Sequence, residues 1–174
     1  MKFYLSGGME YKKDLGIGWR DWLTKELEER RHEAVDPVKL ELPDEHGKPL
    51  QARLTVLKIA GKLDEVRDLC RRSFFRKDIF GIQLAEALVV YYDGAVQKGA
   101  GTLSEVWEAF REGKPIYLIT DFKVEEIPVW LIAETTAIFS DFELFLGYVD
   151  NHSNVIRDMM NAKKVADEVL GGIY

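Results

Sequence analysis

Three acidic residues between positions 76 and 120 have the side chains and the local settings that a catalytic cleft would use. They are Asp78, Asp93 of an Asp-Gly pair, and Glu105. Carboxyl groups that meet in a cleft are the standard means of cleaving a glycosidic bond. The sequence therefore suggests a glycoside-cleaving site, provided that the surrounding elements bring the three acids together.

Asp93 follows a segment with the composition of a buried strand. Residues 87–92 read ALVVYY, a β-branched and aromatic run that the turn at Asp93 and Gly94 ends. Asp93 is therefore predicted at the carboxyl end of a strand, which is the rim where open α/β sheets bind ligands.

Glu105 is predicted in the first turn of the next helix, on the same rim. That helix runs from about 103 to 112, with Thr102 or Ser104 as its cap and Gly-Lys-Pro at 113–115 as its end. The positive end of the helix dipole stabilises a carboxylate there by roughly 0.3–1 kcal/mol. Such a carboxylate stays ionised, as a nucleophile must be.

Each acid taken alone also has a structural explanation. An Asp-Gly pair after a strand is most often only a turn, and a glutamate in a first helical turn most often only complements the dipole. The occurrence of the three acids together favours a catalytic site over separate structural roles.

Five segments follow one another in the order and spacing of a known family. They are residues 2–8 (KFYLSGG), 78–82 (DIFGI), 87–94 (ALVVYYDG), 101–105 (GTLSE) and 113–116 (GKPI). Over most of the first 120 residues the chain resembles the nucleoside 2-deoxyribosyltransferase family. Residues 171–174 (GGIY) are also similar to the ending of some bacterial members, in which a terminal tyrosine returns to the catalytic glutamate.

The resemblance implies a role for each matching residue. Glu105 would attack the anomeric carbon and form a covalent deoxyribosyl intermediate. Asp78 would help to protonate the departing base, and Asp93 would bind sugar hydroxyls. The implied substrate-binding residues are Tyr4, Ser6, Gly7, Gly8, Gly94, Gly101, Thr102 and Tyr174. One departure is Trp107, which stands where the family commonly has glycine and bears on the shape of the pocket.

We therefore expect a nucleoside 2-deoxyribosyltransferase that passes the sugar of a 2′-deoxynucleoside to another free nucleobase. One alternative is a 2′-deoxynucleoside 5′-monophosphate N-glycosidase, in which water takes the place of the acceptor base. A non-catalytic nucleotide-binding domain on the same scaffold is another, because fold does not fix function. Phosphate-loop and dinucleotide fingerprints are absent from the sequence, so no cofactor is expected.

Strand and helix signals alternate along the chain. Strands are predicted at 3–5, 33–37, 87–92, 116–119 and 135–139, and helices at 19–31, 103–112, 127–133, 141–148 and 154–170. This pattern predicts a single α/β domain over residues 1–174, flavodoxin-like or Rossmann-like, with a mainly parallel sheet of about five strands flanked by helices.

Residues 38–75 form a possible lid or insertion. Loop chemistry is concentrated at 43–49 (PDEHGKP), and a solvated insertion accounts for it as well as a lid does. A basic run follows at positions 71, 72, 76 and 77, more typical of a solvated helix face than of a phosphate site.

Composition excludes several classes of protein. A chain of 174 residues with 47% apolar content can bury a full core, and a net charge of −6 argues against binding a nucleic acid polymer. Cys70 has no cysteine partner, and the three histidines lack ligand spacing, so no metal site is predicted. Without a signal peptide or a long apolar span, the sequence indicates a cytoplasmic protein with no membrane contact.

An aromatic set in the last third indicates self-association. It consists of Phe139, Phe142, Phe145 and Tyr148, with Trp130 nearby. The alternative is that these side chains pack within the chain. Because the family that the sequence resembles forms dimers or larger rings, we expect a homo-oligomer.

Overall fold

A computed structural model describes residues 1–40 and 50–152 of the chain. Its centre is a five-stranded sheet in which every pairing is parallel, in the order β2-β1-β3-β4-β5. The strands are β1 (Lys2–Gly7), β2 (Glu33–Val35), β3 (Ala87–Tyr91), β4 (Ile116–Ile119) and β5 (Ala137–Phe139). The predicted parallel α/β sheet of about five strands is therefore confirmed.

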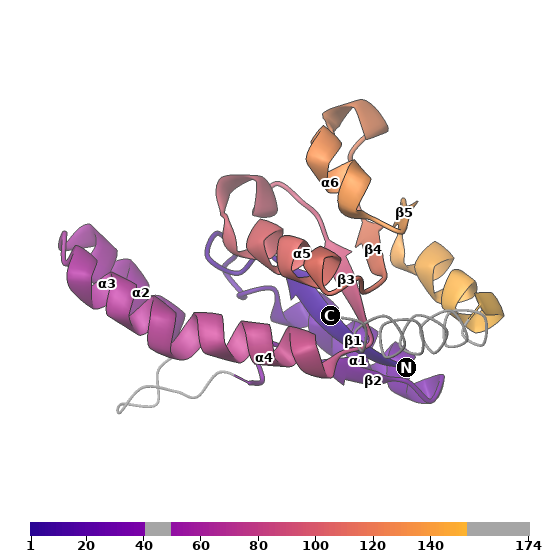
Figure 1. The fold of residues 1–174 in the computed structure, drawn as a ribbon, viewed down its shortest axis with the longest axis horizontal. Helices are drawn as coiled ribbons and strands as arrows, with labels where there is room; N and C mark the ends of the chain where they lie inside the picture. Colours follow the sequence, from indigo (N-terminus) through magenta and orange to yellow (C-terminus); the bar gives the residue numbers. More distant parts are fainter. Residues whose placement is uncertain (41–49, 153–174) are drawn as a thin grey trace, which may run out of the picture.

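Helices cover both faces of the sheet (Figure 1). They are α1 (Ile17–Glu29), α2 (Leu50–Ile59), α3 (Leu63–Leu69), the π-helix η1 (Cys70–Phe75), α4 (Arg76–Leu84), α5 (Gly101–Arg111), α6 (Val129–Glu134) and the 3₁₀ turns η2 (Val96–Lys98) and η3 (Val124–Glu126). Residues 142–152 are also helical. None of the helices within the described ranges has the length and apolarity needed to cross a membrane.

Alternation along β1 assigns its side chains to two separate core clusters. Phe3 and Leu5 pack with α1 and the 142–152 helix, whereas Tyr4 packs on the opposite face with α4, α5 and α6. Successive side chains of a strand point to opposite faces, so Ser6 shares the face of Tyr4. Two polar side chains of β1 thereby face α5.

The strand order predicts a ligand site between β1 and β3. From β1 the chain crosses by α1 to β2 on one side, and every later strand lies on the other side. In doubly wound sheets of this order, ligands bind at this switch point, outside the carboxyl ends of the strands. Here those ends are Gly7 of β1 and Tyr91 of β3, which are paired in register.

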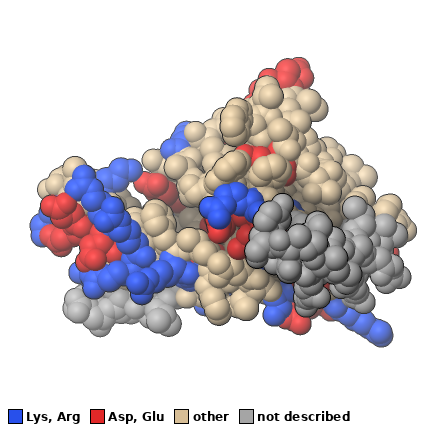
Figure 2. All heavy atoms as spheres, in the orientation of Figure 1, with Lys and Arg blue, Asp and Glu red and all other residues tan. Residues whose placement is uncertain are grey.

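A helical arm extends from the sheet (Figure 1). Its longer limb is continuous from α3 through η1 to α4, because the residues at both junctions keep right-handed helical geometry. Figure 2 shows basic and acidic side chains interspersed at the α2–α3 end, where Arg67 pairs with Asp64 and Arg72 with Asp68. Residues 50–59 and 63–75 are thus helical, while the loop at 43–49 lies outside the described residues, and the lid stays a prediction.

The aromatic set of the last third packs largely within the chain. Phe145 is fully buried, and Phe139, Phe142 and Tyr148 pack against the same core cluster. The intramolecular alternative therefore accounts for these four residues. Trp130 is different, because 74% of it is exposed. The predicted helix at 154–170 lies outside the described residues.

Candidate active site

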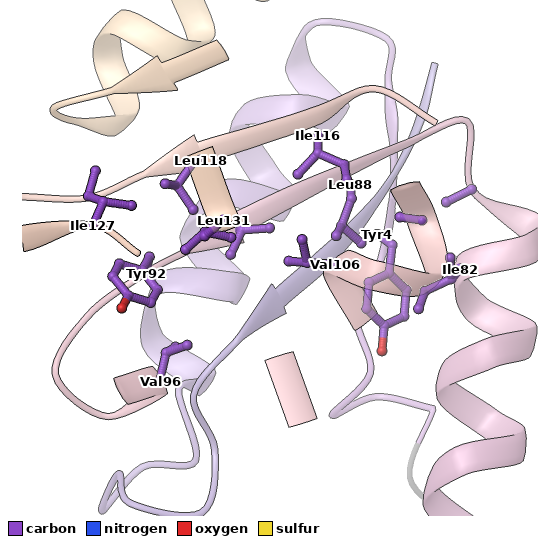
Figure 3. Packing of buried hydrophobic residues seen from close by; sticks show 13 residues of the cluster. Tyr4, Ile82, Leu88, Tyr92, Val96, Val106, Ile116, Leu118, Ile127 and Leu131 are labelled. Carbon is purple, nitrogen blue, oxygen red and sulfur yellow. The ribbon is translucent and has the colours of Figure 1, made fainter. Parts of the chain in front are cut away.

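The carboxylate of Glu105 accepts hydrogen bonds from two side chains of β1. The Tyr4 hydroxyl donates to Oε1 at 2.9 Å, and the Ser6 hydroxyl donates to Oε2. Figure 3 shows Tyr4 beside Ile82 of α4, with its hydroxyl pointing away from the apolar cluster. Both carboxylate oxygens are therefore oriented by donors, which stabilise the ionised form.

The sequence explains why these residues meet. Tyr4 and Ser6 lie two residues apart on the β1 face that α5 covers, and Val106 and Ala109 bury the inner side of α5 against that face. Glu105 precedes Val106, so its side chain emerges at the edge of the same contact. Glu105 is half-buried, which leaves part of it accessible to a ligand.

Asp78 supplies the second carboxyl group of this cluster from the first turn of α4. The pKa of Glu105 is raised to about 7, mainly by burial and next by the negative charge of Asp78, while Ser6, Tyr4 and the Arg20 cation act in the opposite direction. Burial and the two carboxylates also raise the pKa of Tyr4, so its hydroxyl remains a donor. Two interacting carboxyl groups favour sharing one proton.

The prediction for the start of the Glu105 helix was wrong. The helix α5 begins at Gly101, with Ala100 as its N-cap and without a side-chain cap. Ser104 donates its hydroxyl to the Ala100 carbonyl instead of capping. Glu105 therefore lies beyond the first turn, where the dipole is weak. Its hydroxyl donors, rather than the helix end, favour its ionised form.

Asp93 lies on the same rim in a different setting. One carboxylate oxygen accepts from the amides of Ala95 and Val96 at 2.9 and 3.2 Å, and the other pairs with Lys12 Nζ at 2.6 Å. Within the described part of the chain, Asp93 has no hydrogen bond or ion pair with the Glu105 cluster. It orders the turn after β3 and joins it to the loop after β1.

The glycines predicted to bind substrate fall into two groups. A Cβ on Gly7 would come within 2.9 Å of Trp19, and one on Gly8 within 2.9 Å of Ala95, so both are required by close packing. At Gly94 and Gly101 an added Cβ would meet no atom of the described residues within 4 Å. Packing therefore does not require these two glycines.

Thr102 and Tyr174 are the remaining residues that were predicted to bind substrate. Thr102 is buried at the start of α5. Tyr174 lies outside the described residues. Among the side chains in the described ranges, no three His, Cys, Asp or Glu are grouped as metal ligands.

Two cations near the site were missed by reasoning from sequence. Lys12, the partner of Asp93, lies in a loop whose course has no local signal. Arg20 is fully buried and donates to backbone carbonyls. The sequence did contain a signal that Arg20 is buried, because it lies three and seven residues before the core positions Leu23 and Leu27 on the same face of α1.

Two solved structures have the same fold. A 2-deoxyribosyltransferase from Bacillus psychrosaccharolyticus matches with a TM-score of 0.58 and 20% identity, over 87% of this chain and 91% of that one. The CMP N-glycosidase of Clostridium botulinum matches with a TM-score of 0.50 and 16% identity, over 87% and 99%. No protein-family model and no curated protein sequence matches the chain. The fold implied by the sequence resemblance is thus confirmed.

Proposed function

We propose that this chain is a nucleoside 2-deoxyribosyltransferase with Glu105 as its nucleophile. The observation that carries the proposal is the Glu105 carboxylate beside β1, held by the hydroxyls of Tyr4 and Ser6 and facing the charge of Asp78. A half-buried glutamate whose carboxylate is held by donors near a second carboxyl group supports retaining glycosyl transfer, which uses such a pair.

In the first step a Glu105 oxygen attacks C1′ of the bound 2′-deoxynucleoside. The bond between C1′ and the base breaks, and the base departs with the electron pair and a proton from Asp78. The product is a glycosyl ester on Glu105. In the second step a nitrogen of another base attacks C1′, the ester bond breaks, and Asp78 takes up the proton that the new base loses.

The donor geometry supports this division of labour between the two acids. Tyr4 and Ser6 donate to both oxygens of Glu105 and thereby favour its charged form. The reactive form is the one in which Glu105 is charged and Asp78 holds the proton for the departing base; these donors favour that form, and the burial of Glu105 opposes it. An oxocarbenium-like transition state would be stabilised by the adjacent anion.

Hydrolysis is the second candidate, because one of the two matching structures is an N-glycosidase. One assay distinguishes these candidate functions. The protein is incubated with each 2′-deoxynucleoside and each 2′-deoxynucleoside 5′-monophosphate, with and without a free acceptor base, and the products are separated by chromatography. Base exchange that needs the acceptor supports the transferase, and sugar release without it supports the hydrolase. No turnover of any substrate would leave a non-catalytic nucleotide-binding domain.

The sugar provides an internal check on the proposal. A 2′-hydroxyl withdraws electrons from an oxocarbenium-like centre, so 2′-deoxy substrates should react faster than their ribo counterparts. Comparable kcat/KM values on both series would contradict a deoxyribosyl specificity.

We also propose that the protein is a homo-oligomer. The support is an exposed aromatic surface on α5 and α6, in which Trp107 lies 6.4 Å from Trp130 and 5.8 Å from Phe110 between ring centres. Light scattering of the parent and of Trp130→Ser tests this. A monomer mass for both proteins at micromolar concentration would refute it.

A further inference from the structure

Arg20 occupies the place of a missing strand at the active-site end of β1. The amide of Glu33 donates to the Met1 carbonyl from the β2 side, whereas the amide of Glu86 donates to the Lys2 carbonyl from the β3 side. Carbonyls of a strand alternate in direction, so those of Leu5 and Gly7 point toward β2 as well.

The strand β2 ends before it can satisfy those two carbonyls. Its register with β1 stops at Val35, opposite Tyr4. Arg20 donates from Nε to the Leu5 carbonyl at 3.1 Å and from Nη2 to the Gly7 carbonyl at 2.8 Å. A buried carbonyl needs a donor, and the planar guanidinium supplies two in a fixed fork.

The same side chain also holds the far end of the loop that follows β1. Its Nη1 donates to the carbonyls of Leu15 and Gly16, both at 3.1 Å. Both residues have positive φ, and a Cβ on Gly16 would lie 2.5 Å from Nη1. The loop is therefore closed around Arg20, and glycine provides the room.

Arg20 thereby connects the two halves of the site without touching Glu105. The residue between its two strand carbonyls is Ser6, the donor to Glu105, and the loop that it closes carries Lys12, the partner of Asp93. The side chain is fully buried and faces Asp36 at 3.8 Å. Misplacement of catalytic groups by about 1 Å can cost about 100-fold in rate.

We propose that Arg20 is a positioning residue of the active site, which holds Ser6 in place to orient Glu105 and places a buried positive charge behind the nucleophile. The charged and titratable groups that face Glu105 are Tyr4 and Asp78, with Arg20 on the α1 side. Those that face Arg20 are Asp36, Asp14, Tyr4 and Glu105. In its catalytic aspect the inference rests on the proposed function.

Two substitutions of Arg20 separate the effect of its forked hydrogen bonds from the effect of its positive charge. Arg20→Lys keeps a cation but loses the fork, so we expect kcat to fall about 100-fold with little change in the pH dependence. Arg20→Gln also removes the cation, so the ionisation of Glu105 should move to higher pH, by roughly half a unit to one unit. The matched control is Arg30→Gln at the end of the same helix, where Arg30 binds Glu26 and Asp150 at the surface.

The measurement is a carbon-13 NMR titration of the Glu105 carboxyl, assigned with Glu105→Gln, together with kcat and KM. The titration needs no turnover. A shifted midpoint in Arg20→Gln, with the parent inactive on every substrate, would refute the proposed function and keep the role of Arg20. An unshifted midpoint and kcat within twofold of the parent in a folded Arg20→Gln would overturn the inference. Failure of both Arg20 variants to fold would overturn it as well, because Arg20 would then be a folding residue.

Discussion

Glu105 and Asp93 lie at the same rim of the sheet and have opposite surroundings. Glu105 is bound by two neutral hydroxyls and faces another carboxylate, and its pKa is raised to about 7. Asp93 is bound by a lysine and two backbone amides. The first arrangement leaves a carboxylate reactive, whereas the second neutralises it and uses it to connect two loops. Under the proposed function, we therefore expect Glu105 rather than Asp93 to be the nucleophile, because their neighbours differ although both lie at the rim.

The largest effect is expected at Glu105. Glu105→Gln removes the nucleophile while keeping the shape of the side chain, so kcat for base release should fall by about four orders of magnitude. Glu108→Gln, on the same helix with Arg111 as its partner, is the matched control and should stay near the parent. Activity of Glu105→Gln within tenfold of the parent would show that Glu105 is not the nucleophile.

Glu105→Gln should also remove a loss of stability that the parent shows as the pH rises. A folded-state pKa of about 7 against an ordinary value of 4.5 means that the folded protein holds this proton more tightly than the unfolded chain. The free energy of unfolding of the parent should therefore fall between pH 4.5 and 7, by up to about 3 kcal/mol. Urea unfolding of Glu105→Gln should lack this loss, and a parallel pH dependence in both proteins would contradict the raised pKa.

Asp78→Asn should have the next largest effect. Loss of the proton donor should lower kcat by about 100-fold or more, and less for a 2′-deoxyriboside whose leaving group needs no protonation. Removal of a neighbouring negative charge lowers the pKa of Glu105, so the rising limb of the pH profile should move below that of the parent. An upward movement of that limb would mean that Asp78 does not act on Glu105 as a charge.

Tyr4→Phe should have a moderate effect. The Glu105 carboxylate loses one donor, so kcat should fall by about tenfold, and the rising limb should move to higher pH because the charged form is less stabilised. Tyr92→Phe, another buried tyrosine in the same core cluster, is the control. Equal behaviour of the two variants would remove Tyr4 from the catalytic machinery.

The smallest effect is expected at the Asp93 pair. Asp93→Asn keeps an oxygen that can accept from Ala95 but loses the charge pairing with Lys12, so KM should rise by a few fold with kcat nearly unchanged, a loss of about 1 kcal/mol. Lys12→Met should give the same result, and the double variant should be no worse than either single one. A loss of kcat in Asp93→Asn as large as that of Glu105→Gln would show that Asp93 also takes part in catalysis, and would contradict the difference proposed between the two acids.

Local patterns were sufficient to predict the strands of the sheet. The apolar run at 116–119 became β4 with the predicted bounds, and the run at 87–92 became β3 with its final tyrosine left outside. These strands are buried on both faces, so their composition has little freedom. The arm at 50–84 was not predicted, because many of its apolar side chains, among them Val56, Ile59 and Phe80, are exposed and give no clear periodicity.

The candidate site was predictable only where local sequence patterns carry its residues. Tyr4, Ser6 and Glu105 were predicted from short motifs that resemble those of a known family, and the structure joins them by hydrogen bonds, while their roles stay predictions. Arg20 and Lys12 act through partners that only the fold brings near: Leu5 and Gly7 for Arg20, and Asp93 for Lys12. A sequence shows which side chains are present, but the pairing of charges across loops depends on the path of the chain.

The proposed mechanism depends most on Glu105 as a covalent nucleophile, and one measurement tests this role directly. The protein is mixed with a 2′-deoxynucleoside in the absence of an acceptor base, quenched with acid within one turnover, digested and analysed by mass spectrometry. We expect the peptide containing Glu105 to gain the mass of one 2-deoxyribosyl group, and the same peptide of Glu105→Gln to gain none. Release of the base at the parent rate without any adduct on this peptide, or with the adduct on another residue, would contradict it.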